Sequence, residues 1–168
     1  MNYQLLSLLV VSLTGCSSSP PMDPDPIDSA SIVLNAEDID KYWNSHKKVA
    51  PIFPTREMRS GVYSCINVLF VIGEDGLVHS PKVIAAFPKR NKHFEKASIT
   101  AVKKFIYTAS AENESKERVI TSNVFTFFVT ADRSRSEEEK EFERKLESTC
   151  KVDLTSKASG TAILAAPS

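Results

Sequence analysis

The chain has 168 residues, a length that suits one domain with additional segments at its ends. Hydrophobic residues make up 42% and charged residues 25%, which is ordinary for a globular protein. Lys plus Arg and Asp plus Glu both number 21, so no net positive charge draws the protein toward nucleic acid. We therefore expect no nucleic-acid partner.

Residues 1–15 have the pattern of an export signal. Leu5 to Leu13 form an uncharged apolar run that is too short to span a bilayer, which takes about 20 residues, but typical in length of a signal peptide. The sequence Leu13-Thr14-Gly15-Cys16 that follows is similar to the lipobox of bacterial lipoproteins. This resemblance implies cleavage before Cys16 and attachment of acyl chains such as palmitate to Cys16. The alternative is a soluble protein with an apolar N-terminal helix.

Residues 16–34 are interpreted as the lipidated cysteine and a flexible tether. The stretch contains four prolines between Pro20 and Pro26 and has no apolar periodicity. Ser17 follows Cys16, and by resemblance to enterobacterial sorting this residue implies the outer membrane rather than retention in the inner membrane. We thus expect a protein that faces the periplasm and contacts the membrane through its lipid.

The first folded element is predicted from residue 35. Asn35 precedes two acidic residues and is typical of a helix N-cap, and Ile39 and Trp43 would share one face of that helix. The Trp is expected to pack in the core rather than to bind a ligand. Pro51 and Pro54 end this helix and open a short second one.

The stretch from Val62 to Phe87 predicts a β-hairpin. Asp75-Gly76 between two runs of β-forming residues is a strong turn signal. Leu69 and Val71 make the second face of the first strand apolar as well, so we expect this strand to be covered on both sides. The first face carries Ile66, Val68, Phe70 and Ile72.

A helix and a strand are predicted after the hairpin. Phe94 to Tyr107 has helical spacing of apolar residues, and the lysines outside this stripe are expected to form a solvated face. Ala109 to Arg118 is a polar loop, and Val119 to Thr130 has the composition of a third strand.

Ser136 to Cys150 predicts a further helix with a narrow apolar stripe of Phe142, Leu146 and Cys150. This stripe would cover one face of the first hairpin strand and bring Cys150 beside Cys65. With Cys16 lipidated, these are the remaining cysteines, and an exported protein favours a disulfide between them over a nucleophilic Cys65. The predicted helix occupies residues 131–152, and residues 153–168 are predicted to be disordered.

These elements predict an α+β fold, with a small antiparallel sheet of two or three strands packed against helices in residues 35–130. The same region resembles the C-terminal domain of TonB. Phe53-Pro54 stands for the family's Tyr-Pro pair, Gly61 for the glycine after its short helix, and Glu74-Asp75-Gly76 for its hairpin turn. Phe105 and Tyr107 stand where Trp and Phe end the family helix. The C-terminal helix is an addition to this pattern.

The resemblance implies binding by strand addition at the last strand. TonB domains pair with an extended segment of an outer-membrane transporter, and an exposed sheet edge invites such pairing. The alternative is an edge blocked by the C-terminal helix or by a second copy of the chain. The residues expected at this edge are Ile120, Ser122, Val124, Thr126 and Phe128.

The sequence pattern predicts neither the spanning helix nor the long spacer of TonB-type transducers. We therefore expect a lipid-anchored binding or scaffolding module whose partner is an envelope protein, either an outer-membrane transporter or a second copy of the chain. A TonB-like energy-transducing component is the alternative.

The sequence predicts no catalytic site, metal site or cofactor. His46, His79 and His93 are scattered and have no metal-ligand spacing, and no serine lies in a nucleophile-elbow pattern. A binding protein is thus favoured over an enzyme.

Overall fold

The computed structural model of the chain describes residues 32–88, 91–128 and 136–158. The predicted signal peptide, Cys16 and residues 16–31 of the predicted tether lie outside these ranges. Within them, no helix combines the length and the apolar character that crossing a membrane requires.

Within the described ranges, the main sheet has four strands in the order β1-β6-β3-β4. The central pairs β3–β4 and β3–β6 are antiparallel, whereas β1 runs parallel to β6. A separate two-stranded antiparallel sheet consists of β2 and β5. The strands are β1 (Ile32–Val33), β2 (Trp43–Lys47), β3 (Ser64–Ile72), β4 (Val78–Phe87), β5 (Ile106–Ala109) and β6 (Val119–Phe127). The predicted α+β class, hairpin and last strand are confirmed, with β1 and the β2–β5 pair added.

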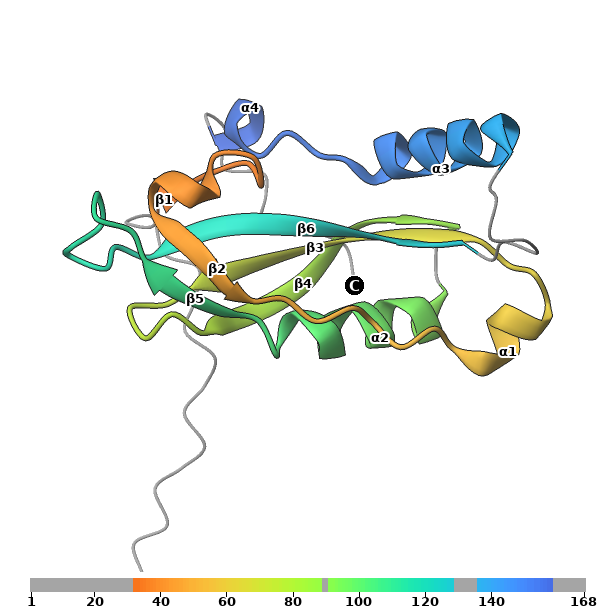
Figure 1. Ribbon diagram of the computed structural model, residues 1–168, viewed down its shortest axis with the longest axis horizontal. Helices are drawn as coiled ribbons and strands as arrows, with labels where there is room; N and C mark the ends of the chain where they lie inside the picture. Colours follow the sequence, from red (N-terminus) through yellow and green to blue (C-terminus); the bar gives the residue numbers. More distant parts are fainter. Residues whose placement is uncertain (1–31, 89–90, 129–135, 159–168) are drawn as a thin grey trace, which may run out of the picture.

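Helices lie on both faces of the main sheet, with α2 on one side and α3 on the other (Figure 1). The helical elements are η1 (Ile39–Lys41, a 3₁₀ turn), α1 (Thr55–Arg59), α2 (Lys92–Val102), α3 (Glu137–Cys150) and α4 (Thr155–Ala158). All nine residues of β3 are buried, which agrees with the expectation of a strand covered on both sides.

The two faces of β3 support separate hydrophobic clusters. The α2 face, defined by Ile66, Val68, Phe70 and Ile72, packs against a large cluster that includes Phe94 and Trp43. The α3 face, defined by Cys65, Asn67, Leu69 and Val71, packs against two small clusters. Complete burial of an aliphatic or aromatic side chain contributes about 1.5–3 kcal/mol, so the α2 face carries most of the hydrophobic stabilisation.

The helix predicted from Asn35 is wrong. Residues Ile39–Lys41 form a single 3₁₀ turn, and Trp43 begins β2, which pairs with β5 from Trp43↔Ala109 onward. This long-range pairing overrides the local helical spacing of Ile39 and Trp43. Trp43 is fully buried and its Nε1 donates to the Glu117 carbonyl at 3.0 Å, so its predicted role as a packing residue is confirmed.

The helix predicted to reach Tyr107 ends at Val102. Phe105 and Tyr107 are still buried, because the chain reverses and enters β5. Tyr107 N donates to the Gly76 carbonyl at 2.9 Å, and a Cβ at Gly76, whose φ is +74°, would collide with the Tyr107 carbonyl oxygen. The hairpin turn therefore requires a glycine because β5 passes so close to it.

The ends of the folded part extend beyond the predicted boundaries. Ile32 and Val33, assigned to the tether, pair with Val119 and Ile120. In the predicted disordered tail, Leu154 is buried against the α3 face and residues Thr155–Ala158 form α4. Residues 159–168 lie outside the described ranges. Strand pairing of the partly buried Ile32 and Val33 at one end, and burial of Leu154 at the other, explain why the folded part is longer than the sequence pattern indicates.

Candidate partner-binding edge of β6 and the helix beside it

The two edges of β6 have different neighbours. One edge pairs with β3 along its whole length, from Ile72↔Val119 to Ser64↔Phe127. On the other edge, Ile32 N donates to the Arg118 carbonyl at 3.1 Å and Leu34 N to the Ile120 carbonyl at 2.9 Å. Beyond Ile120, no strand within the described ranges pairs with this outer edge. Among the described residues, the sheet thus has an open edge over most of β6.

Three residues direct their backbone groups to this open edge. The N–H and C=O of one strand residue point to the same side, and the side alternates along the strand. Because the Ile120 carbonyl faces β1, the backbone groups of Ser122, Val124 and Thr126 face outward in the same direction. The Val124 carbonyl accepts a hydrogen bond from Asn123 Nδ2 at 3.2 Å.

The five residues predicted at the edge have their side chains on the α3 face of the sheet. These side chains face other parts of the same chain and not a partner. Ile120 packs with Leu69 and Leu154, and Val124 packs against the Cys65–Cys150 cluster. The Ile120 backbone is also already engaged by β1, and Phe128 lies one residue past the end of β6. The outer edge therefore offers mainly backbone groups, at Ser122, Val124 and Thr126. Binding of a partner there stays a prediction.

Helix α3 covers the α3 face rather than the outer edge. Ser136 caps its N-terminus, where its Oγ accepts from Glu139 N at 3.2 Å and Glu139 Oε2 accepts from Ser136 N at 2.9 Å. Leu146 and Cys150 are buried against the sheet, as their spacing predicts, whereas Phe142 is 42% exposed. The helix contacts β3, β4 and β6 across the sheet.

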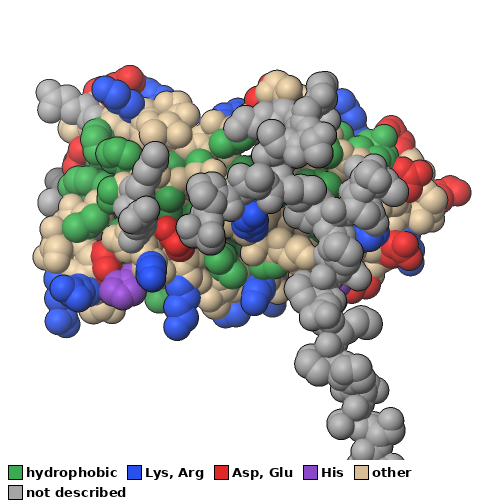
Figure 2. Space-filling model, turned by 180° about the vertical axis from the view of Figure 1, so that it is seen from behind, with side chains coloured by type: hydrophobic (Ala, Val, Ile, Leu, Met, Phe, Trp, Pro, Cys, Tyr) green, Lys and Arg blue, Asp and Glu red, His purple; other side chains and the backbone are tan. Residues whose placement is uncertain are grey.

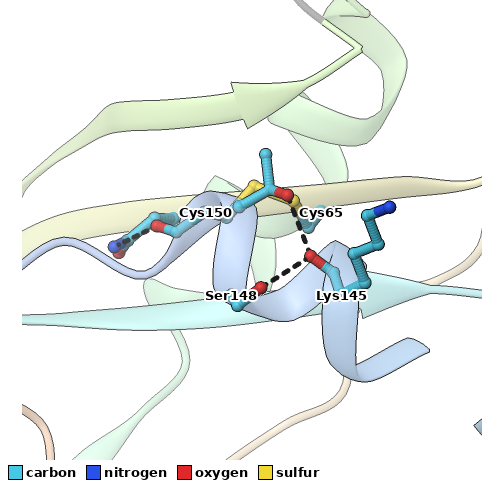
Figure 3. Close-up of a disulfide and its surroundings, with 6 residues drawn as sticks. Cys65, Lys145, Ser148 and Cys150 are labelled. Atoms are coloured by element: carbon cyan, nitrogen blue, oxygen red, sulfur yellow. Dashed lines mark hydrogen bonds between the residues drawn. A yellow bond between two sulfur atoms is a disulfide. The ribbon is translucent and has the colours of Figure 1, made fainter. Parts of the chain in front are cut away.

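A disulfide joins the end of α3 to the start of the central strand β3, between Cys65 and Cys150 (Figure 3). Their Cα atoms are 6.0 Å apart, and Asn67 Nδ2 donates to the Cys150 carbonyl at 3.0 Å. Both cysteines are buried, so the structure agrees with the predicted structural pair and not with an accessible nucleophile at Cys65. In the chain-entropy model a disulfide closing so long a loop contributes about 4–5 kcal/mol.

A groove of about 600 Å³ lies beside the outer edge of β6, where the chain turns away after β1. It is closed at one side by two links between the segment after β1 and the segment after α3. Asn35 Nδ2 donates to Asp153 Oδ1 at 3.0 Å, and Lys151 Nζ lies 3.6 Å from Glu37 Oε1. The lining residues are Asn35, Ala36, Glu37, Asn67, Ser122, Asn123, Val124, Glu147, Ser148, Lys151, Val152 and Asp153.

Asp153 organises the segment that closes this groove. Its Oδ1 accepts from the Thr155 hydroxyl at 2.7 Å and from the Thr155 backbone N–H at 3.0 Å. The hydrogen bonds from the Thr155 side chain and from Asn35 lower the pKa of Asp153 to about 2. The carboxylate is therefore charged at neutral pH.

The histidines occupy three separate places. His46 is exposed in β2, His79 lies 3.1 Å from Asp75 Oδ1 next to the hairpin turn, and His93 at the start of α2 contacts Glu57 of α1. The bond with His93 lowers the pKa of the buried Glu57 carboxyl. In the described part of the chain, no group of three or more His, Cys, Asp or Glu residues is placed to hold a metal ion.

Basic side chains gather on the side of the molecule that carries α2. Figure 2 shows Lys and Arg side chains along the lower margin of the molecule. Lys92, Lys96, Lys103 and Lys104 are all exposed in or next to α2. This arrangement agrees with the solvated lysine face expected from the sequence, and it lies opposite the face that α3 covers.

The part of the chain that contains β6 and its outer edge is similar to a known protein family. Residues 49–128 match the family model described as the C-terminal part of the Gram-negative bacterial TonB protein. This match ends before α3, so the helix and Cys150 lie outside it. Comparison with curated protein sequences gives no match.

Two solved structures are similar to the chain. The solution structure of the TonB C-terminal domain of Pseudomonas aeruginosa has 20% identity and a TM-score of 0.47, covering 60% of this chain and 97% of that one. The TonB2 protein of Vibrio anguillarum has 22% identity and a TM-score of 0.40, covering 68% and 95%.

Proposed function

Because residues 49–128 match the model of the TonB C-terminal family, we propose that the protein is a lipid-anchored binding or scaffolding module of the bacterial cell envelope. In this proposal the domain binds an envelope protein by strand addition at the outer edge of β6. The acyl chains on Cys16 hold it at a membrane, the outer membrane in preference to the inner one, with the domain in the periplasm.

The open edge of β6 is the observation that carries the proposal. Ser122, Val124 and Thr126 present outward backbone groups that no strand of the described ranges pairs with. An extended segment can form main-chain hydrogen bonds with such an edge, and these bonds supply much of the affinity in strand addition. Since the side chains of these residues face α3, binding would depend chiefly on the backbone.

The compartment is supported by two independent features. The sequence Leu13-Thr14-Gly15-Cys16 is similar to a lipobox. The disulfide between Cys65 and Cys150 is a bond that forms and persists in oxidising compartments such as the periplasm.

A proline substitution tests strand addition directly. Thr126→Pro removes an outward-facing N–H without removing a hydrogen bond to β3, so the sheet should fold while pairing at the edge is lost. Thr126→Ala is the matched control, because it changes the side chain and keeps the N–H. After crosslinking in intact cells, the wild type and Thr126→Ala should capture the same envelope protein and Thr126→Pro should not. Equal capture by Thr126→Pro would contradict binding at this edge.

The lipid anchor is tested by the intact mass of protein extracted from membranes. We expect a chain that starts at Cys16 and carries acyl groups. Alkylation should modify Cys65 and Cys150 only after reduction. A mass that corresponds to the unprocessed chain from Met1 would exclude the anchor and the proposed location.

The alternative function is that of a TonB-like energy-transducing component that contacts an outer-membrane transporter. The family match favours this alternative. It requires that the protein fractionate with the inner membrane and that the protein captured through the β6 edge be a transporter. Fractionation with the outer membrane would instead favour the anchored module.

A further inference from the structure

The groove beside β6 is lined by polar as well as apolar side chains, and it lies at the proposed binding edge. Ser122 and Val124 form one wall, and the C-terminal turn of α3 and the segment after it form the other. An extended segment paired with β6 beyond Ile120 would run directly past this groove. Side chains alternate along such a segment, so some of them would point toward α3.

The lining of the groove carries an excess of negative charge. Three acidic residues, Glu37, Glu147 and Asp153, line it together with one basic residue, Lys151. Lys151 is already close to Glu37, at 3.6 Å. The last turn of the 14-residue helix α3 also ends at the groove, and the C-terminus of a helix carries partial negative charge.

Asn67 adds a buried acceptor to this negative lining. It is 1% exposed and lines the groove from the β3 side. Its Nδ2 is used in the bond to the Cys150 carbonyl, whereas Oδ1 has no hydrogen-bond partner among the described residues. A buried acceptor without a donor is costly, so this position favours a ligand that can donate a hydrogen bond.

We propose that the groove is a subsite for a basic side chain, Lys or Arg, of the strand that pairs with β6. Lys and Arg have hydrogen-bond donors and no acceptors, which matches both the free Asn67 Oδ1 and the carboxylates of Glu147 and Asp153. A carboxylate side chain would meet like charge, and an apolar one would leave Asn67 unpaired. This inference rests on the proposed function for the identity of the strand, but the subsite itself can be tested alone.

The subsite is tested with single-residue probes that need no strand pairing. N-acetyl-lysine-N-methylamide is titrated into the isotope-labelled full chain with its disulfide intact, and N-acetyl-norleucine-N-methylamide is titrated in parallel. The lysine probe should shift the signals of the Asn67 side-chain amide and the Ser122 backbone amide, and the norleucine probe should not. The shifts should weaken as salt is added, because exposed charge interactions are screened.

Two variants that each remove one negative charge from α3 test whether the charge at the groove is the one that binds the lysine probe. Glu147→Gln should weaken binding of the lysine probe roughly two- to fivefold, as expected for one exposed ion pair. Glu141→Gln removes the same charge from α3 outside the groove and should leave binding unchanged. Equal shifts with both probes, no shift with either, or equal effects of the two variants would overturn the subsite.

The same probes separate this inference from strand addition. Thr126→Pro should bind the lysine probe as the wild type does, because the probe forms no ladder with β6. If the lysine probe binds and Thr126→Pro still captures the envelope partner, the subsite stands and strand addition fails. If the lysine probe does not bind and Thr126→Pro abolishes capture, strand addition stands and the subsite fails.

Discussion

The two faces of the sheet are stabilised in different ways. On the α2 face, large aromatic side chains contact one another. The centroid of the Phe94 ring lies 4.6 Å from that of Phe127 and 5.5 Å from that of Phe53. On the α3 face, the buried apolar residues are few, and the buried polar residues Asn67 and Ser122 lie among them. A covalent bond from Cys65 to Cys150 holds α3 there. The domain that matches the family uses hydrophobic packing, whereas the added helix depends on a crosslink.

Phe94→Ala should have the largest effect, because it removes a fully buried ring from the α2 face. The loss of transfer free energy and the cavity left behind should lower the free energy of unfolding by about 3–5 kcal/mol. Denaturant unfolding measures this change. Phe142→Ala is the control, since Phe142 is partly exposed on α3. A loss under 1 kcal/mol for Phe94→Ala would show that the α2 face does not dominate stability.

Removing the disulfide by Cys65→Ala together with Cys150→Ala should lower the free energy of unfolding by about 2–5 kcal/mol. The loss of local stability should be larger in α3 than in α2, because the disulfide holds α3 and lies on the opposite face of the sheet from α2. Amide hydrogen exchange should accelerate in α3 while α2 remains protected. Equal acceleration in both helices would mean that the two faces unfold as one cooperative unit.

Ser136→Ala should destabilise α3 alone, by about 1 kcal/mol, because it removes the side-chain acceptor of the capping box. Hydrogen exchange in the first turn of α3 measures this local change. Ser136→Asp keeps an acceptor at the cap and should restore protection. A global loss of stability in Ser136→Ala would contradict the separation of the two faces.

Acidification should release the segment after α3 as Asp153 becomes protonated. The pKa of Asp153 is lowered in the folded protein from 3.8 to about 2, so its stabilising contribution is present above pH 3.8 and is lost as the pH falls toward 2. The Leu154 and Thr155 amide signals should follow this titration in NMR spectra. In Asp153→Asn the shifts in this pH range should disappear. Their persistence would assign them to another carboxylate.

The sequence predicts those elements whose pattern is local. Alternating residues with Asp75-Gly76 between them identify the β3–β4 hairpin. The spacing of Leu146 and Cys150, with a single remaining partner at Cys65, predicts both the position of α3 and the disulfide.

The remaining elements depend on contacts between distant parts of the chain. Trp43 belongs to a strand only because β5 lies beside it, and Ile32 and Val33 are too few to give a pattern. The groove is assembled from residues 35–37, 122–124 and 147–153 with Asn67, so no local spacing could have revealed it. The outward direction of the Ser122, Val124 and Thr126 backbone groups follows from the pairing of β1, which the sequence pattern did not predict.

The short strand β1 has a mechanical consequence. It connects the N-terminal segment to the rest of the domain by pairing with β6, through backbone hydrogen bonds that include those from Ile32 to Arg118 and from Leu34 to Ile120. A force applied to the domain through that segment is carried first by the hydrogen bonds between β1 and β6. If they break, Ile120 joins Ser122, Val124 and Thr126 in presenting outward backbone groups. Tension on the N-terminal segment would then lengthen the edge that is available for pairing.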